Sequence, residues 1–354
     1  MVKKFYGNKQ FFQDSSKSRE NAQKNMHKLI KSFLDYFAKK GYTKHPAVKI
    51  SSGADSSVHF IGSHISVFKP YLEKEKVPTP GYILSQSCIR TQNLKKYSQK
   101  EYTFNWGSFF LSLGLIAPPT RLNEVIIESM DYIRNILKID DKNLKIMINS
   151  KDKEFMNACK ELKLNKFLEI DTKPLEYYRH KLGYENIFGK NFNFAIKDAN
   201  KNEFADVGNI IIIEKDEKPV AVELALGTST IIKQVCGLEH ILDCTNIHVP
   251  IKDNIWLRRK IEDIIIVAVA LYREGLRPSN KAKARILGDY IKTLSYLRSE
   301  AKISLEELKR IIQKYEKDNY PKDKKLVYDE IIDFINNFEN KTTIYNQFVQ
   351  RLKK

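Results

Sequence analysis

The chain changes its pattern of apolar residues at Pro250, and this change limits the folds open to it. Before Pro250, short runs of β-branched residues alternate with turn residues, which is typical of strands. The runs DVGNIIIIE and VAVELAL, residues 206–214 and 220–226, flank a charged turn and predict an antiparallel hairpin. After Pro250, apolar residues recur at helical spacing. An α+β part followed by an all-helical part predicts two domains.

The apolar spacing places helices along both parts of the chain. One helix is predicted from about residue 26 to Gly41, and residues 45–115 are predicted as strands and turns. Ser304 with Glu307 forms a capping box at the start of a later helix. The helices predicted after Pro250 cover residues 255–274, 281–301, 304–317 and 325–338. We therefore predict a basic arm over residues 1–20, an α+β domain over 21–250 and a helical domain over 251–354.

The chain is strongly basic, with a formal net charge of +18. Residues 1–50 alone hold 12 Lys and Arg against 3 Asp and Glu, an excess of 9 positive charges. Such a field attracts polyanions and gives affinity that depends on salt, so a nucleic acid is the partner that fits best. The alternative is a solvated, lysine-rich surface without a dedicated partner.

Several classes of protein do not fit this sequence. No apolar stretch is long enough to span a membrane, and the first residues lack the apolar core of a signal peptide. A cytoplasmic protein without a membrane partner is therefore expected. The cysteines are scattered and form no CxxC pair, so neither a disulfide framework nor a protein-bound metal site is predicted. They are Cys88, Cys159, Cys236 and Cys244.

Residues 61–91 carry the most specific functional signal in the chain. They contain the segments FKPY and SQSCIRT, and the second predicts a strand that delivers Arg90 to its tip. A planar guanidinium in a fixed position can meet phosphate oxygens two at a time. The segment EYTFNWGSFF, residues 101–110, predicts a return strand with aromatic rings. A cation on one strand and a ring on the next would suit the phosphate and base of a nucleotide.

These segments, in this order and at this spacing, resemble the catalytic core of alanyl-tRNA synthetases, which are class II aminoacyl-tRNA synthetases. That family carries FKPYF, SQKCIRT and HTFFEM. The resemblance runs from about residue 20 to about residue 300 of this chain. It implies an α+β fold in which a class II synthetase-like antiparallel sheet is flanked by helices and followed by an all-helical domain.

The resemblance also implies residues that bind ATP. Arg90 matches the arginine that contacts the α-phosphate, where a fixed cation relieves the charge of the attacked phosphate. Phe104 matches a ring that stacks on adenine, although core packing is an equal alternative for it. Thr103 and Lys100 are implied as neighbouring nucleotide contacts, and Gly227 matches the glycine that lets a helix start close to ATP. ATP chemistry would also require Mg²⁺.

The segment ELALGTSTI, residues 223–231, departs from the family in two ways. Glu223 stands where the family has the aspartate that holds the amino group of alanine. Thr230 stands where the family has an arginine that binds the γ-phosphate, and Lys233, one turn later, is a substitute cation. Asn191-Phe192-Asn193 matches an Asn-Phe-Trp segment with the tryptophan lost. These departures remodel the amino-acid pocket, and the resemblance as a whole implies alanine or another small amino acid as the substrate.

Residues 271–294 resemble the segment that opens the tRNA acceptor-stem domain of the family. Asn280 matches the asparagine that helps to read the acceptor stem, and a helix N-cap is the alternative role for such a residue. Lys281, Lys283 and Arg285 are implied as contacts to phosphates. The acceptor stem of a tRNA is thus the implied macromolecular partner.

Taken with the resemblance, the sequence predicts a ligase that forms an aminoacyl-adenylate from ATP and passes the acyl group to tRNA. A chain of this length leaves no room for an editing domain, so editing in cis is not expected. The resemblance leaves the oligomeric state open between a monomer and a homodimer, because class II cores often pair. Two alternatives remain. One is a stand-alone paralogue with a non-tRNA acceptor, and the other is a paralogue that binds tRNA or an amino acid without catalysis.

Overall fold

The computed structural model describes residues 11–12, 19–322 and 325–353, so most of the predicted basic arm over residues 1–20 lies outside the described residues. The chain divides into two compact units. The first unit comprises residues 1–48, 63–87 and 111–239, and the second comprises residues 49–62, 88–110 and 240–354. The boundary predicted near residue 250 is thus at 239/240, and two earlier segments join the helical unit. This division depends on contacts between segments that are distant in sequence, and such contacts cannot be predicted from the local spacing of apolar residues.

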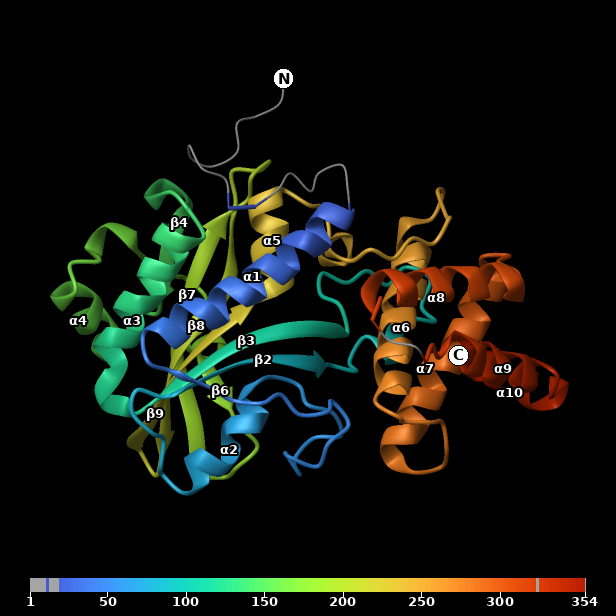
Figure 1. Cartoon of the computed structure of the whole chain (residues 1–354), viewed down its shortest axis with the longest axis horizontal. Helices are drawn as coiled ribbons and strands as arrows, with labels where there is room; N and C mark the ends of the chain where they lie inside the picture. The colour runs from blue at the N-terminus through green and yellow to red at the C-terminus, as the bar shows by residue number, and fades with distance from the viewer. Residues whose placement is uncertain (1–10, 13–18, 323–324, 354) are drawn as a thin grey trace. The chain divides into compact units, whose positions relative to one another are not determined.

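One sheet contains the nine strands of the described residues (Figure 1). Its order is β1-β2-β3-β9-β8-β7-β4-β5, with β6 paired to β7. The pairs from β3 through β9, β8 and β7 to β4 are antiparallel, whereas β1 with β2 and β4 with β5 are parallel. The α+β fold with an antiparallel centre is therefore confirmed. The strands are β1 Thr43–Lys44, β2 Tyr82–Ile89, β3 Phe109–Ala117, β4 Leu144–Ile148, β5 Leu168–Ile170, β6 Arg179–Lys181, β7 Ile187–Lys197, β8 Phe204–Lys215 and β9 Lys218–Gly227.

The hairpin predicted over residues 206–226 is formed by β8 and β9. Its turn residues Asp216 and Glu217 have φ of 50° and 63°, the pair of left-handed conformations that a type I′ turn requires. The predicted strand before Arg90 is β2, which ends at Ile89. The return strand starts later than predicted, at Phe109, so Thr103 and Phe104 lie in a loop.

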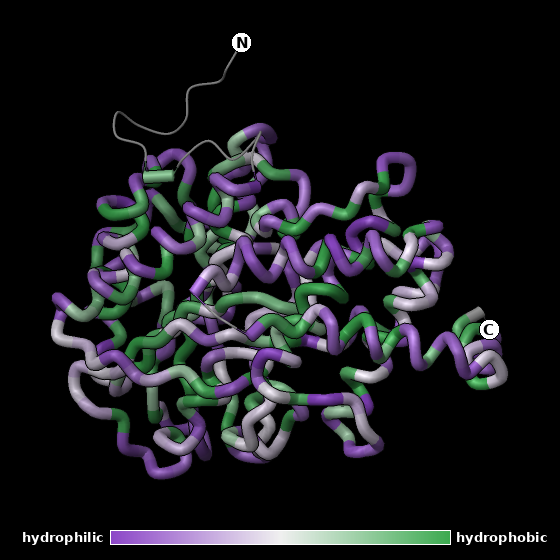
Figure 2. The backbone as a smooth tube through the Cα atoms, turned by 45° about the vertical axis from the view of Figure 1, so that its right-hand side comes forward, coloured by the Kyte–Doolittle hydropathy of each residue, from purple (hydrophilic) through white to green (hydrophobic). Residues whose placement is uncertain are grey.

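Helices of the first unit pack on its strands, and Figure 2 shows hydrophobic (green) and hydrophilic (purple) stretches alternating along the backbone. One of them, α2, falls where strands and turns were predicted, and it contains Pro70, a residue that normally argues against a helix interior. Burial overrides that local signal, since Phe68 and Leu72 of α2 pack with Ile116 and Ile211 of the sheet. The helices are α1 Arg19–Lys39, α2 Ile65–Glu73, α3 Leu122–Asp131, which continues into a π-turn, α4 Lys153–Glu161 and α5 Thr228–Cys236.

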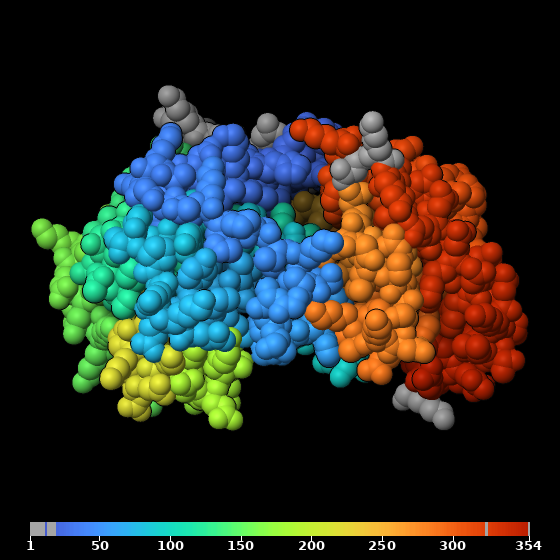
Figure 3. All heavy atoms as spheres, turned by 60° about the horizontal axis from the view of Figure 1, so that its bottom comes forward, coloured from blue at the N-terminus to red at the C-terminus, as the bar shows by residue number. Residues whose placement is uncertain are grey.

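The second unit is mostly helical, as predicted. The four helices predicted after Pro250 are present within a few residues, and a fifth, α10, was not predicted. Ser304 caps its helix as expected, because its Oγ accepts a hydrogen bond of 3.1 Å from the Glu307 backbone. In Figure 3 these helices, coloured orange to red, cover a continuous surface, and α7 packs against α6 and α9. Their bounds are α6 Ile255–Arg273, α7 Ala282–Glu300, α8 Leu305–Asn319, α9 Tyr328–Glu339 and α10 Thr342–Lys353.

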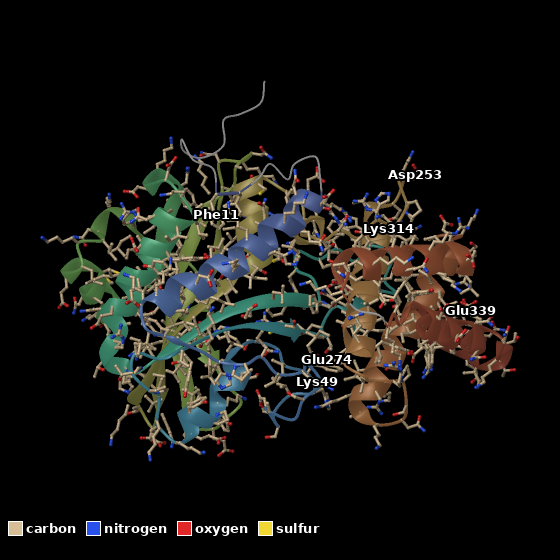
Figure 4. All side chains as sticks on the ribbon, viewed as in Figure 1. Phe11, Lys49, Asp253, Glu274, Lys314 and Glu339 are labelled. Atoms are coloured by element: carbon tan, nitrogen blue, oxygen red, sulfur yellow. The ribbon has the colours of Figure 1, made fainter. Side chains whose placement is uncertain are left out.

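Residues 49–62 are fixed to the end of α6 by Glu274. Its carboxylate accepts hydrogen bonds from the backbone of Ile50 at 2.6 Å and of Ser51 at 3.0 Å. Lys49 Nζ donates to the Glu274 carbonyl at 3.1 Å, and Figure 4 shows the two side by side. These bonds explain why a segment from the front half of the chain belongs to the helical unit. No helix of the described residues is both long and apolar enough to span a bilayer.

A buried carboxyl joins α6 to residues 88–110. Asp263 is fully buried, and it accepts hydrogen bonds from the Ser108 backbone at 2.8 Å and from the Tyr97 hydroxyl. Burial raises the pKa of Asp263 from 3.8 to about 6, although both hydrogen bonds act in the opposite direction. The carboxyl therefore prefers its neutral form more strongly in the folded protein than in the unfolded chain.

This preference makes the contribution of Asp263 to stability depend on pH. Between about pH 4 and pH 6 the folded state holds a proton that the unfolded state has lost, so this contribution falls as the pH rises and is constant above pH 6. We expect the loss to reach about 3 kcal/mol. Urea unfolding at pH 4 to 7 should therefore show a decline in wild type that Asp263→Asn lacks. The control Asp329→Asn, at an exposed ion pair, should follow wild type, whereas parallel curves for Asp263→Asn and wild type would contradict the expectation.

Candidate functional site

Polar side chains gather on one face of the central strands of the first unit, where β3, β9, β8 and β7 are neighbours (Figure 1). Residues directly opposite on paired strands project to the same side of a sheet. Two rows therefore share this side, Ile116–Glu223–Ile211–Asn191 and Gly114–Ala225–Asn209–Asn193. We use the name polar face for five residues, which are Glu223, Asn209, Asn191, Asn193 and Asp206.

Glu223 lies at the centre of the sheet and is 2% exposed. Its Oε1 is 2.6 Å from Nε2 of His64, a buried residue directly before α2, while its Oε2 has no hydrogen-bond partner. The other ring nitrogen of His64 is 2.7 Å from Ser112 Oγ. Gly114 makes room for this ring, because a Cβ there would lie 2.0 Å from it. Glu223 is thus held on one side and has a free acceptor on the other.

The amides of the polar face form a chain of hydrogen bonds. Asn191 Nδ2 donates to Asn193 Oδ1 at 2.5 Å, and Asn193 Nδ2 donates to Asp206 Oδ2 at 2.9 Å. The hydroxyl of Tyr177 also donates to Asp206, and burial together with this bond raises the pKa of Tyr177. Oδ1 of Asn191 and Oδ1 of Asn209 are buried without a partner.

Three carboxylates lie on β8 and β9, the strands at the centre of this face. Asp206 is engaged by Asn193 and Tyr177, Glu214 lies 2.5 Å from Lys190, and Glu223 contacts His64. Among the described residues, no group of three or more His, Cys, Asp or Glu could hold a metal ion. Because these carboxylates are already engaged, they do not form a site for a protein-bound Mg²⁺ ion.

Arg90 follows β2 and belongs to the second unit. Its Nε donates to the Gly62 carbonyl at 3.2 Å, and its guanidinium lies 5.0 Å from the centre of the Phe110 ring. Desolvation lowers the pKa of Arg90, whereas the nearby Cys88 thiol raises it. The residue is exposed, and no described residue accepts a hydrogen bond from its terminal nitrogens. One edge of the guanidinium is therefore anchored and the other edge is available to an anion.

Phe104 differs from the prediction of a ring that stacks on adenine. The residue is 4% exposed and packs among Tyr97, Tyr102, His240 and Trp256. A base could reach this ring only after other side chains were displaced, so the alternative of core packing describes it. The sequence could not separate the two roles, because both require an aromatic residue. The neighbouring residues Lys100 and Thr103 are exposed.

The start of α5 holds the remaining residues predicted near ATP. Gly227 precedes the helix, and Thr230 Oγ1 donates back to its carbonyl at 2.8 Å. A Cβ at Gly227 would approach this hydroxyl to 2.4 Å, so glycine permits the tight first turn. Lys233 is half-buried on the same helix, and no described residue pairs with its amine.

The residues predicted to meet tRNA lie before and within the first turn of α7. The N-cap of α7 is Lys281, so Asn280 is not the N-cap residue that the alternative interpretation expected. Asn280 is exposed and makes no hydrogen bond with any described residue. Lys283 Nζ donates to the carbonyls of Ser51 and Ser52, both at 2.9 Å, and is therefore occupied.

Two neighbouring cations of this group remain open to solvent. Lys281 and Arg285 are exposed, and neither forms an ion pair with a described residue. Lys281 and Arg285 are therefore accessible for the phosphate contacts predicted for them. A phosphate contact by Lys283 would require its amine to break the hydrogen bonds to the carbonyls of Ser51 and Ser52.

Comparison with known proteins confirms the resemblance predicted from the sequence. The chain is 27% identical over 123 residues to the alanine–tRNA ligase of Tropheryma whipplei, which is 34% of this chain and 14% of that protein. It is 24% identical over 301 residues to the alanine–tRNA ligase of Caldicellulosiruptor saccharolyticus, which is 73% of this chain and 33% of that protein. The chain is thus similar to alanine–tRNA ligases and spans a third or less of their length. No model of a known protein family matches it.

Solved structures give more distant similarities. A threonyl-tRNA synthetase from Aeropyrum pernix matches with a TM-score of 0.39 and 11% identity, over 74% of this chain and 70% of that chain. The histidyl-tRNA synthetase of S. aureus matches with a TM-score of 0.36 and 13% identity, over 66% of this chain and 75% of that chain.

Proposed function

We propose that this protein activates an amino acid with ATP and transfers the acyl group to tRNA. The observation that carries this proposal is the buried carboxylate of Glu223, which has one oxygen 2.6 Å from Nε2 of His64 and the other without a partner. A buried acceptor without a partner is costly unless a ligand supplies a donor. An ammonium group offers both the donor and the opposite charge, and the similarity to alanine–tRNA ligases makes an amino acid the natural source of that ammonium.

Each proposed role follows from a property of the side chain. Glu223 binds the ammonium and so orients the substrate carboxylate. Arg90 binds the α-phosphate of ATP, and its guanidinium stabilises the charge that develops when the carboxylate attacks. The products are an aminoacyl-adenylate and pyrophosphate. Lys233 is the cation available for the outer phosphates, and Mg²⁺ would accompany the nucleotide as in other ATP-dependent reactions.

Pyrophosphate exchange tests the proposal directly. The protein is incubated with ATP, labelled pyrophosphate, Mg²⁺ and each of the standard amino acids, with and without tRNA. Exchange that depends on an amino acid, together with charging of tRNA, is the expected result. Exchange without charging would favour a non-tRNA acceptor. A protein that binds tRNA but catalyses no exchange would be a binding paralogue, and the proposed activation would be wrong.

The first turn of α7 provides a separate prediction about tRNA. We expect Lys281→Ala and Arg285→Ala each to weaken tRNA binding and to reduce the slope of log K against log salt by about 1, because each removes one phosphate contact. Filter binding at several salt concentrations measures both quantities. Lys283→Ala is the matched control, because its amine is held by Ser51 and Ser52. Unchanged salt slopes for both test variants would argue against tRNA binding at this turn.

A further inference from the structure

The polar face presents three unpaired acceptors, which are spread over three neighbouring strands. Oε2 of Glu223, Oδ1 of Asn191 and Oδ1 of Asn209 are all buried without a partner. Glu223 and Asn191 are 2% and 1% exposed, so neither residue can reach bulk water without rearrangement. Buried polar atoms in folded proteins normally have partners, and three such atoms on one face indicate a ligand with more than one donor group.

The direction of the amide chain makes Asn191 an acceptor toward the ligand. Asp206 can only accept, so Asn193 must turn its amino group toward it and its oxygen toward Asn191. Asn191 then donates to that oxygen, which leaves its own Oδ1 as the group facing outward. Asp206, at one end of this series of hydrogen bonds, thus determines that Asn191, at the other end, presents an acceptor to the ligand. A flipped Asn191 would place its oxygen against the oxygen of Asn193, and neither could donate a hydrogen bond.

The spacing of the strands separates these acceptors by more than one small side chain. Glu223 on β9 and Asn191 on β7 occupy the same cross-strand row, with Ile211 of β8 between them. Two interstrand spacings place their Cα atoms roughly 10 Å apart. The two acceptor side chains shorten this span, but the methyl group of alanine carries no donor that could complete it.

We propose that the polar face selects an amino acid whose side chain carries a hydrogen-bond donor several bonds from the ammonium. This inference rests on the proposed function and narrows its substrate class. The ammonium binds Glu223, and the side-chain N–H or O–H donates to Asn191, with Asn209 as the neighbouring acceptor. Alanine and other apolar amino acids leave these oxygens unpaired, and an aspartate or glutamate side chain places lone pairs against them. Both groups are therefore rejected.

The expected discrimination is large enough to measure. A site built to hydrogen-bond a substrate group rejects analogues that lack this group much more strongly than an apolar site rejects a missing methylene. We expect at least tenfold tighter binding of the preferred donor-bearing amino acid than of alanine or valine. Asn191→Leu, which removes the acceptor at similar volume, should reduce this ratio to about threefold or less.

The test measures binding and turnover separately on the full chain. Affinities for the standard L-amino acids are measured by calorimetry, and pyrophosphate exchange is measured with the same set. Asn209→Leu is the second variant, because Asn209 is half-buried and its replacement is less disruptive than a change at the fully buried Asn191. Asn135→Leu, at an exposed asparagine bonded to Asp131, is the control and should keep the wild-type ranking.

The outcomes separate the two proposals. Donor-bearing amino acids at the top of the ranking, with the preference reduced in Asn191→Leu or Asn209→Leu, support the inference even if no exchange occurs and activation is disproved. Alanine or another apolar amino acid at the top of the ranking overturns the inference, although exchange would still support activation. The inference is also overturned if no amino acid binds, or if the preference survives in both variants.

Discussion

Replacement of Arg90 by alanine is expected to slow amino-acid-dependent pyrophosphate exchange by about 10²–10³-fold in kcat, the usual effect of removing one group that stabilises developing charge. Its Nε is anchored to Gly62 and its plane lies against Phe110, which leaves the outer nitrogens for a phosphate. Arg90→Lys should recover only part of the rate, because an ammonium keeps the charge but not the paired hydrogen bonds.

Steady-state exchange kinetics for wild type, Arg90→Ala and Arg90→Lys measure this effect. Arg134→Ala is the control, because Arg134 forms a partly buried ion pair with Asp141 and has no proposed ligand. Its rate should match wild type. A rate for Arg90→Ala within threefold of wild type would remove Arg90 from the proposed phosphate site.

Substitution of Glu223 by glutamine is expected to raise the amino-acid KM by about 10- to 100-fold, with a smaller change in kcat. The variant keeps the shape but loses the charge, and a hydrogen bond to a charged group contributes about 1.5–3 kcal/mol. The ammonium contact exists in both ground state and transition state, so its loss appears mainly in KM. The KM for ATP should stay within about twofold of wild type.

Glu214→Gln is the matched control for this change. Glu214 lies on the neighbouring strand and already pairs with Lys190, so its neutralisation should leave the amino-acid KM unchanged. Equal effects of the two substitutions would indicate a general electrostatic effect of the sheet rather than a bound ammonium. An unchanged KM in Glu223→Gln would contradict the proposed ammonium site outright.

Much of the fold could be predicted because its signals are local. The β-branched runs around residues 214–220 predicted the hairpin of β8 and β9, and the helical spacing after Pro250 predicted α6 to α9 within a few residues. The errors arose where packing outweighed local preference. Helix α2 contains Pro70 and still forms, because its apolar residues are buried against the sheet.

The site could be predicted only in part. Resemblance singled out Glu223 and Arg90, and their surroundings are compatible with the roles proposed for them. It also singled out Phe104 and Lys283, which the structure shows to be engaged in packing and in carbonyl contacts. One overlooked signal was present in the sequence, because Asn209 is a polar residue immediately before the four isoleucines of a buried strand.

The sequence by itself determined the β8–β9 hairpin, helices α6 to α9 and the chemical types of the residues that could bind a substrate. Only the tertiary structure decided which of them meet. His64, Ser112 and Glu223 come from three separate segments, and the fold brings His64 within 2.6 Å of Glu223 and 2.7 Å of Ser112. Asp206 likewise determines, through its hydrogen bond with Asn193, which way the side-chain amide of Asn191 is turned. Hydrogen bonds depend on distance and orientation in space, and these are fixed by strand pairing rather than by position along the chain.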